Sequence, residues 1–145
     1  MKEYQDEGIA FQYPPAWELS EDRCDAGICI SVTDGGTAFW SITLLFDRPP
    51  LKAVLEETLK SFEEYQELET EALEAEVAGF PARGCDLGFV CYDLLNTAKI
   101  RIFRTGRFTA VVLSQAMDEE VEQQAIFDAI NDSLDCRRDG NIRIE

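Results

Sequence analysis

The chain of 145 residues contains no histidine. Histidine is the side chain that most often serves as a general base, as the partner of a nucleophilic serine or cysteine, and as a metal ligand. Its absence removes most hydrolytic and metal-dependent chemistry, although carboxylate, cysteine and lysine chemistry stay open. We therefore expect no catalytic residue, no metal and no cofactor, and a protein that is not an enzyme.

Closely spaced cysteine pairs are also missing. The five cysteines, Cys24, Cys29, Cys85, Cys91 and Cys136, are odd in number and form no C-x-x-C motif. This pattern disfavours a disulfide framework and a ribbon-type zinc site. We expect reduced structural thiols that are mostly buried, because buried cysteine behaves as a small hydrophobic residue. A Cys24–Cys136 bridge is the alternative that the sequence leaves open.

The sequence has no hydrophobic run near the roughly 20 residues that a membrane-spanning helix needs. Its first seven residues, MKEYQDE, are polar and acidic, unlike a secretory signal. These two observations predict a cytoplasmic protein without a membrane span.

Positive charge is scarce. Lys and Arg number 13 against 29 Asp and Glu, which gives a net charge of −16. Such a polyanion repels phosphate backbones and anionic lipid, so we expect no nucleic-acid partner. A protein partner, with a basic one favoured, fits this charge better; the alternative is that the charge serves solubility alone. The pattern does not distinguish a monomer from a homodimer.

What the chain does contain suits one folded domain spanning residues 1–145. Hydrophobic residues make up 46% and aromatic residues 10% of the sequence, enough for a sizeable core. Residues 136–145 are polar, and we expect them to form a loose tail.

The centre of the predicted fold is the stretch from Ala82 to Gln115. It predicts three antiparallel strands, Ala82–Tyr92, Ala98–Arg104 and Arg107–Gln115, with Thr105-Gly106 as a two-residue loop that pairs Ile102 with Thr109. Alternation along the strands places Ile100, Ile102, Thr109, Val111 and Leu113 on one face, and Lys99, Arg101, Phe103, Phe108, Ala110 and Val112 on the other. If residues 93–97 form a loop that pairs Cys91 with Lys99, the second face also gains Leu87, Phe89 and Cys91. Both faces are then apolar, and each needs a covering layer.

The remaining segments supply these layers. Strands are expected at Ile9–Tyr13, at Ala26–Thr33 and Thr37–Phe46 around an Asp34-Gly35-Gly36 hairpin turn, and at Glu74–Phe80. Helices are expected at Leu51–Tyr65 and at Asp118–Leu134, with Asp118 as the N-cap and the glutamates after Leu51 as a solvated face. The prediction is an α+β fold: a three-layer α/β/α sandwich whose mainly antiparallel sheet has about six to eight strands and one main helix on each face.

Four short stretches resemble the PsbP/Mog-type domains, which include DcrB-like proteins. They are FQYPPAW at residues 11–17, VAGFPA at 77–82, TAKIRIF at 97–103 and FDAINDSL at 127–134. The resemblance implies an α/β/α sandwich and binding rather than catalysis. Members of this family include a photosystem-associated subunit, a Ran-binding protein, envelope proteins and cytosolic chaperones for type VI secretion effectors.

The most uneven charge distribution singles out Lys99, Arg101 and Phe103 as a candidate partner-binding patch, because residues 94–117 hold bases but no acid. The alternative is that Lys99 and Arg101 pair with carboxylates of a covering helix. The sequence therefore predicts a non-catalytic cytoplasmic protein-binding or adaptor domain, and in a more specific version a chaperone for a secreted effector. The alternative function is a small enzyme using carboxylate or cysteine chemistry.

Overall fold

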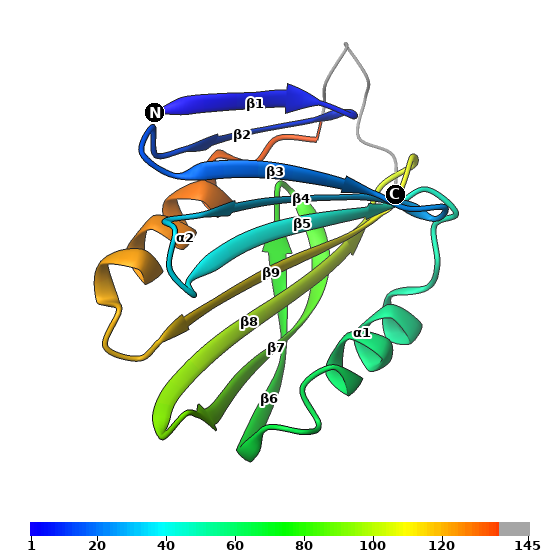
Figure 1. Cartoon of the computed structure of the whole chain (residues 1–145). Helices are drawn as coiled ribbons and strands as arrows, with labels where there is room; N and C mark the ends of the chain where they lie inside the picture. Colours follow the sequence, from blue (N-terminus) through cyan, green and yellow to red (C-terminus); the bar gives the residue numbers. More distant parts are fainter. Residues whose placement is uncertain (137–145) are drawn as a thin grey trace.

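A seven-stranded antiparallel sheet forms the middle layer, in the order β3-β4-β5-β9-β8-β7-β6 (Figure 1). The structure is a computed structural model that describes residues 1–136, so the predicted tail lies outside the described residues except for Cys136, which is buried. The strands are β1 (Lys2–Asp6), β2 (Ile9–Tyr13), β3 (Glu18–Arg23), β4 (Gly27–Thr33), β5 (Phe39–Leu45), β6 (Gln66–Val77), β7 (Phe80–Cys91), β8 (Leu94–Arg104) and β9 (Thr109–Met117), and the helices are α1 (Leu51–Lys60) and α2 (Val121–Ser133). Neither helix has the length and hydropathy to cross a membrane.

The two helices cover opposite faces of this sheet, as predicted. Val111 of β9 belongs to the same buried cluster as Val54 of α1, whereas its neighbour Val112 belongs to the cluster of Ile130 in α2. Successive side chains of a strand point to opposite faces, so α1 and α2 form separate layers. The α+β three-layer sandwich and its antiparallel sheet are therefore confirmed.

The α2 face has a second cover, the small antiparallel hairpin of β1 and β2. Phe11 of β2 contacts Trp40 of β5, with ring centroids 4.8 Å apart. The backbone of Ala10 pairs with that of Asp135, which ties this hairpin to the segment after α2. Among the described residues, the α1 face is covered by one short helix, which packs on β7 and β8 (Figure 1). Part of the α1 face is consequently left open.

Two hairpins differ from the predicted register. The β8–β9 loop has four residues, Thr105–Phe108, because the Thr105 hydroxyl accepts hydrogen bonds from the backbone amides of Arg107 and Phe108. This changes the partner of Ile102 from Thr109 to Val111, a shift of two that leaves the predicted faces intact.

The β7–β8 loop is shorter than predicted, with Tyr92-Asp93 as its two residues. Both have positive φ, 50° and 62°, the conformation of the tightest hairpin turns. Cys91 therefore pairs with Leu94 instead of Lys99. The partner of Cys91 is thus five residues from the predicted one. A register change by an odd number of residues exchanges the two faces of a strand, so Leu87 and Phe89 face α1 rather than α2.

The acidic segment after α1 is the largest departure from the prediction. α1 ends at Lys60 instead of Tyr65, and the Glu-rich stretch Gln66–Val77 forms the edge strand β6. Glutamate has low strand propensity, and pairing with β7 overrides it here. Exposed carboxylates on an edge strand also oppose edge-to-edge association.

The predicted N-cap of the second helix was wrong, and one strand was not predicted. Asp118 does not cap α2, which begins at Val121; its carboxylate accepts a hydrogen bond from the Thr97 hydroxyl at 2.6 Å. The polar strand β1 was not anticipated, and it is formed by pairing with β2.

None of the five cysteines forms a disulfide bond within the described residues 1–136. Only Cys85 and Cys136 are buried, whereas Cys29 and Cys91 are half-buried and Cys24 is exposed. The expectation that most thiols are buried was therefore wrong. Cys24 lies in the β3–β4 turn, where its amide bonds to the Gly27 carbonyl.

Candidate functional site

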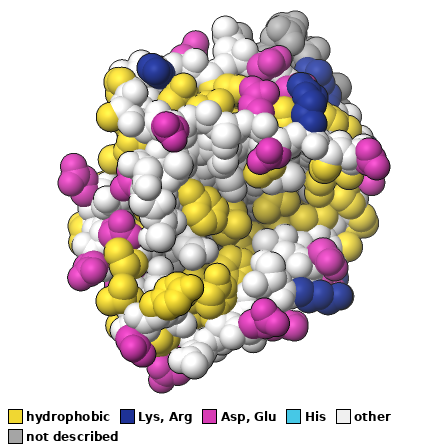
Figure 2. Space-filling view, in the orientation of Figure 1, with side chains coloured by type: hydrophobic (Ala, Val, Ile, Leu, Met, Phe, Trp, Pro, Cys, Tyr) yellow, Lys and Arg dark blue, Asp and Glu magenta, His cyan; other side chains and the backbone are white. Residues whose placement is uncertain are grey.

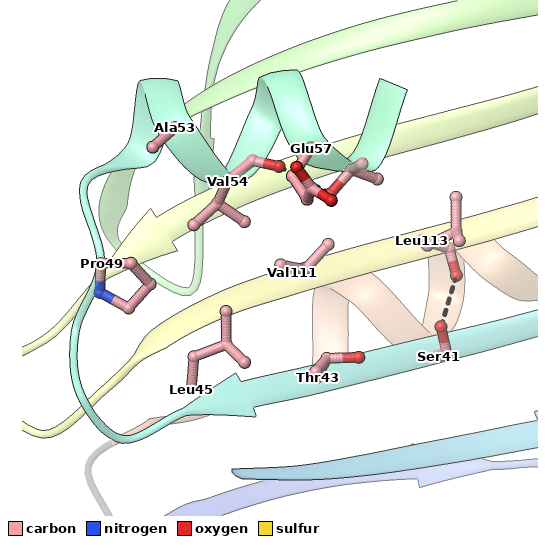
Figure 3. A pocket seen from close by; sticks show the side chains of 10 residues that line it. Ser41, Thr43, Leu45, Pro49, Ala53, Val54, Glu57, Val111 and Leu113 are labelled. Carbon is pink, nitrogen blue, oxygen red and sulfur yellow. Dashed lines mark hydrogen bonds between the residues drawn. The ribbon is translucent and has the colours of Figure 1, made fainter. Parts of the chain in front are cut away.

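An apolar groove of about 520 Å³ lies on the open part of the α1 face, between α1, β5 and β9 (Figure 3). Val54 from the helix and Leu45 and Val111 from the strands point into it (Figure 3). Its lining consists of Ser41, Thr43, Leu45, Pro49, Ala53, Val54, Glu57, Thr58, Val111 and Leu113. Hydrophobic side chains gather across the middle of the face that carries α1 (Figure 2).

The position of α1 creates this groove. The hydroxyl of Thr109 donates to the Pro49 carbonyl at 2.7 Å, and the guanidinium of Arg104 donates to the Arg48 carbonyl at 2.7 Å. These bonds hold the start of the helix near the loop that joins β8 to β9. Phe62, just after the helix, packs on Phe89 of β7, with ring centroids 5.8 Å apart. The helix is thereby held toward β7 and β8, and the space over β5 stays unfilled.

Most polar atoms in the groove are already engaged. The Thr58 hydroxyl donates to the Val54 carbonyl at 2.8 Å, and the Ser41 hydroxyl donates to the Leu113 carbonyl at 3.4 Å. Among the described residues of the lining, Glu57 is the only ionisable one, and it pairs with Lys60 at 3.6 Å on the exposed side of α1. The groove therefore presents mainly methyl and methylene groups to a ligand.

This composition favours contact with an apolar ligand. General acid–base or nucleophilic chemistry needs at least two ionisable groups that converge on one point. The lining offers one carboxylate, and residues 1–136 contain no cluster of three Cys, Asp or Glu side chains that could hold a metal ion. An apolar side chain or segment is the ligand that the groove fits.

Beside the groove, the same face of β3 and β4 carries polar side chains. Ser20, Ser31 and Ser41 are aligned across three neighbouring strands, and the first two hydroxyls lie 3.0 Å apart. Glu18 and Asp22 flank Ser20 on the outer strand, on the same face and both exposed. A ligand that leaves the groove in this direction meets hydroxyl groups first and carboxylates at the edge.

The sequence-predicted patch of Lys99, Arg101 and Phe103 lies on the other face of β8, beneath α2. Phe103 has an exposed fraction of 0% and stacks on Phe80, with ring centroids 5.7 Å apart. The expectation that it would be accessible was wrong, because its ring lies within the buried hydrophobic cluster on the α2 face of the sheet. Phe103 offers no contact surface in this arrangement.

The two bases of this patch are half-buried. Arg101 donates to the carboxylate of Asp86 at 2.8 Å, so its partner comes from strand β7 and not from a covering helix. Lys99 lines a very small cavity with Phe127 and Asp128, and makes no ion pair with the described residues. Partner binding by Lys99 and Arg101 remains a prediction.

The sequence analysis did not identify the groove. One signal was present: Ser41 and Thr43 alternate with Trp40, Ile42 and Leu44 along β5. The apolar residues of this alternation face α2 and the polar residues face the open half of the α1 side. Alternation of this kind indicates a strand with one solvated face.

The fold and groove define an α+β sandwich domain with an apolar groove on one side of an antiparallel sheet. No protein-family model and no curated protein sequence matches the chain. Among solved structures, the fold is similar to that of LpqN of Mycobacterium tuberculosis, a protein involved in cell envelope biogenesis. The TM-score is 0.57 at 15% sequence identity, and the match covers 88% of this chain and 82% of LpqN.

A protein from Bacteroides thetaiotaomicron is also similar, with a TM-score of 0.61 and 16% identity. That match covers 96% of this chain and 49% of the other, so the chain spans about half of the length of that relative. At such low identities these similarities establish a shared fold.

Proposed function

We propose that this chain is a non-catalytic protein-binding or adaptor domain whose groove receives an apolar segment of a partner protein. The observation that carries the proposal is the lining of the groove, which is aliphatic apart from Glu57 and three hydroxyls, of which those of Ser41 and Thr58 are hydrogen-bonded to backbone carbonyls. Exposed apolar concavities of this kind mark interaction sites, because burying them releases ordered water.

The charge around the groove favours a basic partner. Glu57 borders the groove on the α1 side, and Glu18 and Asp22 lie at the edge of the adjoining surface. The net charge of −16 adds a long-range attraction for cations. Lysine or arginine residues that flank an apolar segment would meet these carboxylates, and such charge pairs mainly speed association and select the partner.

A more specific form of the proposal is a cytoplasmic chaperone for a secreted effector, within the PsbP/Mog-type family. The sequence resemblance and the groove support it, because a chaperone of this type must cover an apolar segment of its client before export. The absence of disulfide bonds among the described residues suits a reducing compartment. Fractionation of source cells tests the location: a protein found mainly in the envelope fraction would contradict this form.

The test of the main proposal is a blocked groove. Thr43→Arg places a long cation on the floor of the groove at a half-buried strand position. Thr70→Arg makes the same change on β6, outside the groove, and serves as the matched control. Immobilised wild-type and Thr70→Arg proteins should retain the same partner proteins from source lysate, identified by mass spectrometry, and Thr43→Arg should lose them. Equal retention by all three would contradict the assignment of the groove.

A further inference from the structure

A second exposed apolar surface lies at the tip of the β7–β8 hairpin. The exposed fractions of Tyr92, Leu95 and Leu94 are 94%, 62% and 44%. Val121, at the start of α2, is 70% exposed, and the amide of Asp118 bonds to the Leu95 carbonyl at 2.9 Å, which ties that part of the chain to the hairpin. We call Tyr92, Leu94 and Leu95 the hairpin tip; Figure 1 shows it at the far end of β7 and β8.

The fold does not explain tyrosine at the first loop position. Tyr92 has a φ of 50°, and two-residue loops of this geometry favour asparagine, aspartate or glycine, whereas bulky side chains are unfavourable there. Its ring packs on almost nothing, so it contributes no core contact that would offset the unfavourable backbone. An exposed aromatic residue in a strained loop conformation points to a contact with another molecule.

The charges around the tip identify the chemistry of that molecule. Residues 91–97 and 117–122 contain no Lys or Arg, and their five acids are Asp93, Asp118, Glu119, Glu120 and Glu122. A second copy of this chain would bring the same five acids to the contact, and anionic lipid would be repelled in the same way. Charge complementarity therefore selects a basic protein segment.

We propose that the hairpin tip is a second docking surface, which binds a segment of a partner protein in which apolar residues are flanked by Lys or Arg. It is separate from the groove. Ile100 pairs with Leu113 of the groove wall and lies six positions after Leu94 along β8, a span of about 20 Å at the rise of a strand. Two surfaces this far apart let one domain hold two segments at once, which is what an adaptor requires.

The experiment uses a fluorescein-labelled amphipathic peptide of leucine and lysine, and a counterpart with glutamate in place of every lysine. The tip variant is Tyr92→Ser with Leu95→Ser; both residues are exposed, so the variant should keep the thermal unfolding midpoint of the wild type. Phe46→Ser is the matched control, because Phe46 is 43% exposed and lies away from the tip. Thr43→Arg blocks the groove alone.

Fluorescence anisotropy should show the lysine peptide binding to the wild type, to Phe46→Ser and to Thr43→Arg at the tip. The tip variant should bind about tenfold more weakly, the effect of losing one or two well-buried apolar contacts. Asp93→Asn with Glu119→Gln should weaken binding at low salt, and the glutamate peptide should not bind.

Three results would overturn the proposal: a tip variant that binds within about twofold of the wild type, equal binding of the glutamate peptide, or tip-dependent binding to phosphatidylcholine vesicles in place of peptide. Loss of binding in Thr43→Arg alone would support the groove and reject the tip. Loss in the tip variant alone is the expected result and supports the tip; the groove is tested separately by the retention of partner proteins from source lysate.

Discussion

Trp40 and Asn131 are joined by a hydrogen bond of 2.8 Å from the indole Nε1 to the amide Oδ1. Trp40 lies in the centre of the sheet with an exposed fraction of 0%, and Asn131 lies near the C-terminal end of α2. The bond fixes the helix to one position along β5. It also satisfies the single polar atom of the largest side chain in the core.

Replacing Asn131 with alanine should therefore lower the free energy of unfolding by about 1–3 kcal/mol, because the buried indole N–H loses its acceptor. Asn131→Asp keeps an oxygen at this position and should lose less. Urea unfolding followed by tryptophan fluorescence measures both. A midpoint for Asn131→Ala equal to that of the wild type would show that another group, such as a water molecule, replaces the amide.

Phe62→Ala should be the more costly change on the other face. The ring is buried between Tyr65 and Phe89 and holds the segment after α1 on the sheet, so its removal should cost roughly 2–5 kcal/mol. Glu63→Ala, next to it and exposed, is the control and should change little. If Phe62→Ala unfolds at the same urea concentration as the wild type, α1 does not depend on this ring for its position.

The pKa of Tyr4 predicts how the free energy of unfolding changes at alkaline pH. Burial of its phenol, reinforced by the nearby Glu21 carboxylate, raises the pKa of Tyr4 above its ordinary value of 10.0. The unfolded chain therefore ionises first, so the stability linked to Tyr4 is complete below pH 10 and is lost as pH rises above it.

Tyr4→Phe should remove this part of the pH dependence. It should cost little at neutral pH, because the buried hydroxyl makes no hydrogen bond of ordinary geometry in the described structure, although the Glu21 carboxylate lies near it. Thermal unfolding midpoints at pH 8 and pH 11 provide the measurement, with Tyr92→Phe, whose ring is exposed, as control. A loss of stability at high pH that is identical in Tyr4→Phe and the wild type would reject this role.

The cysteines should differ in reactivity in the native state. Cys24 is exposed, whereas burial raises the pKa of the Cys85 thiol and so lowers its thiolate fraction at neutral pH. Brief alkylation followed by peptide mass spectrometry should label Cys24 first and Cys85 much later. All five should react in denaturant. Labelling of Cys85 as fast as that of Cys24 would mean that β7 opens readily.

The layers of the fold could be predicted from sequence because they depend on local alternation. Ile100 and Ile102 on one face and Phe103 on the other need only the period of two along a strand. The hairpin at Asp34-Gly35-Gly36 was equally predictable, since its glycines mark the turn. A shift of two in the register of β8 and β9 left these faces unchanged.

The strand β6 and the groove could not be predicted in the same way. Gln66–Val77 is rich in Glu and Ala, which favour a helix, and only its pairing with β7 makes it a strand. The groove depends on where α1 lies, which is set by bonds from Thr109 and Arg104 to the backbone before the helix. Such contacts join residues that are far apart in the chain, and no local pattern reveals them.

The pairing of β5 with β9 also constrains how the chain can assemble. β3–β5 and β6–β9 are each simple meanders of neighbouring strands. In the seven-stranded sheet the two meanders are joined by the pairing of β5 with β9, which runs from Phe39–Gln115 to Leu45–Thr109. During synthesis one edge of β5 therefore stays unpaired until β9 has left the ribosome. Contacts between distant parts of a chain form slowly, so we expect the joining of the two meanders to limit the folding rate. A chain that stops before β9 would expose two additional open sheet edges, at β5 and β8, the condition under which strands pair with the wrong molecule.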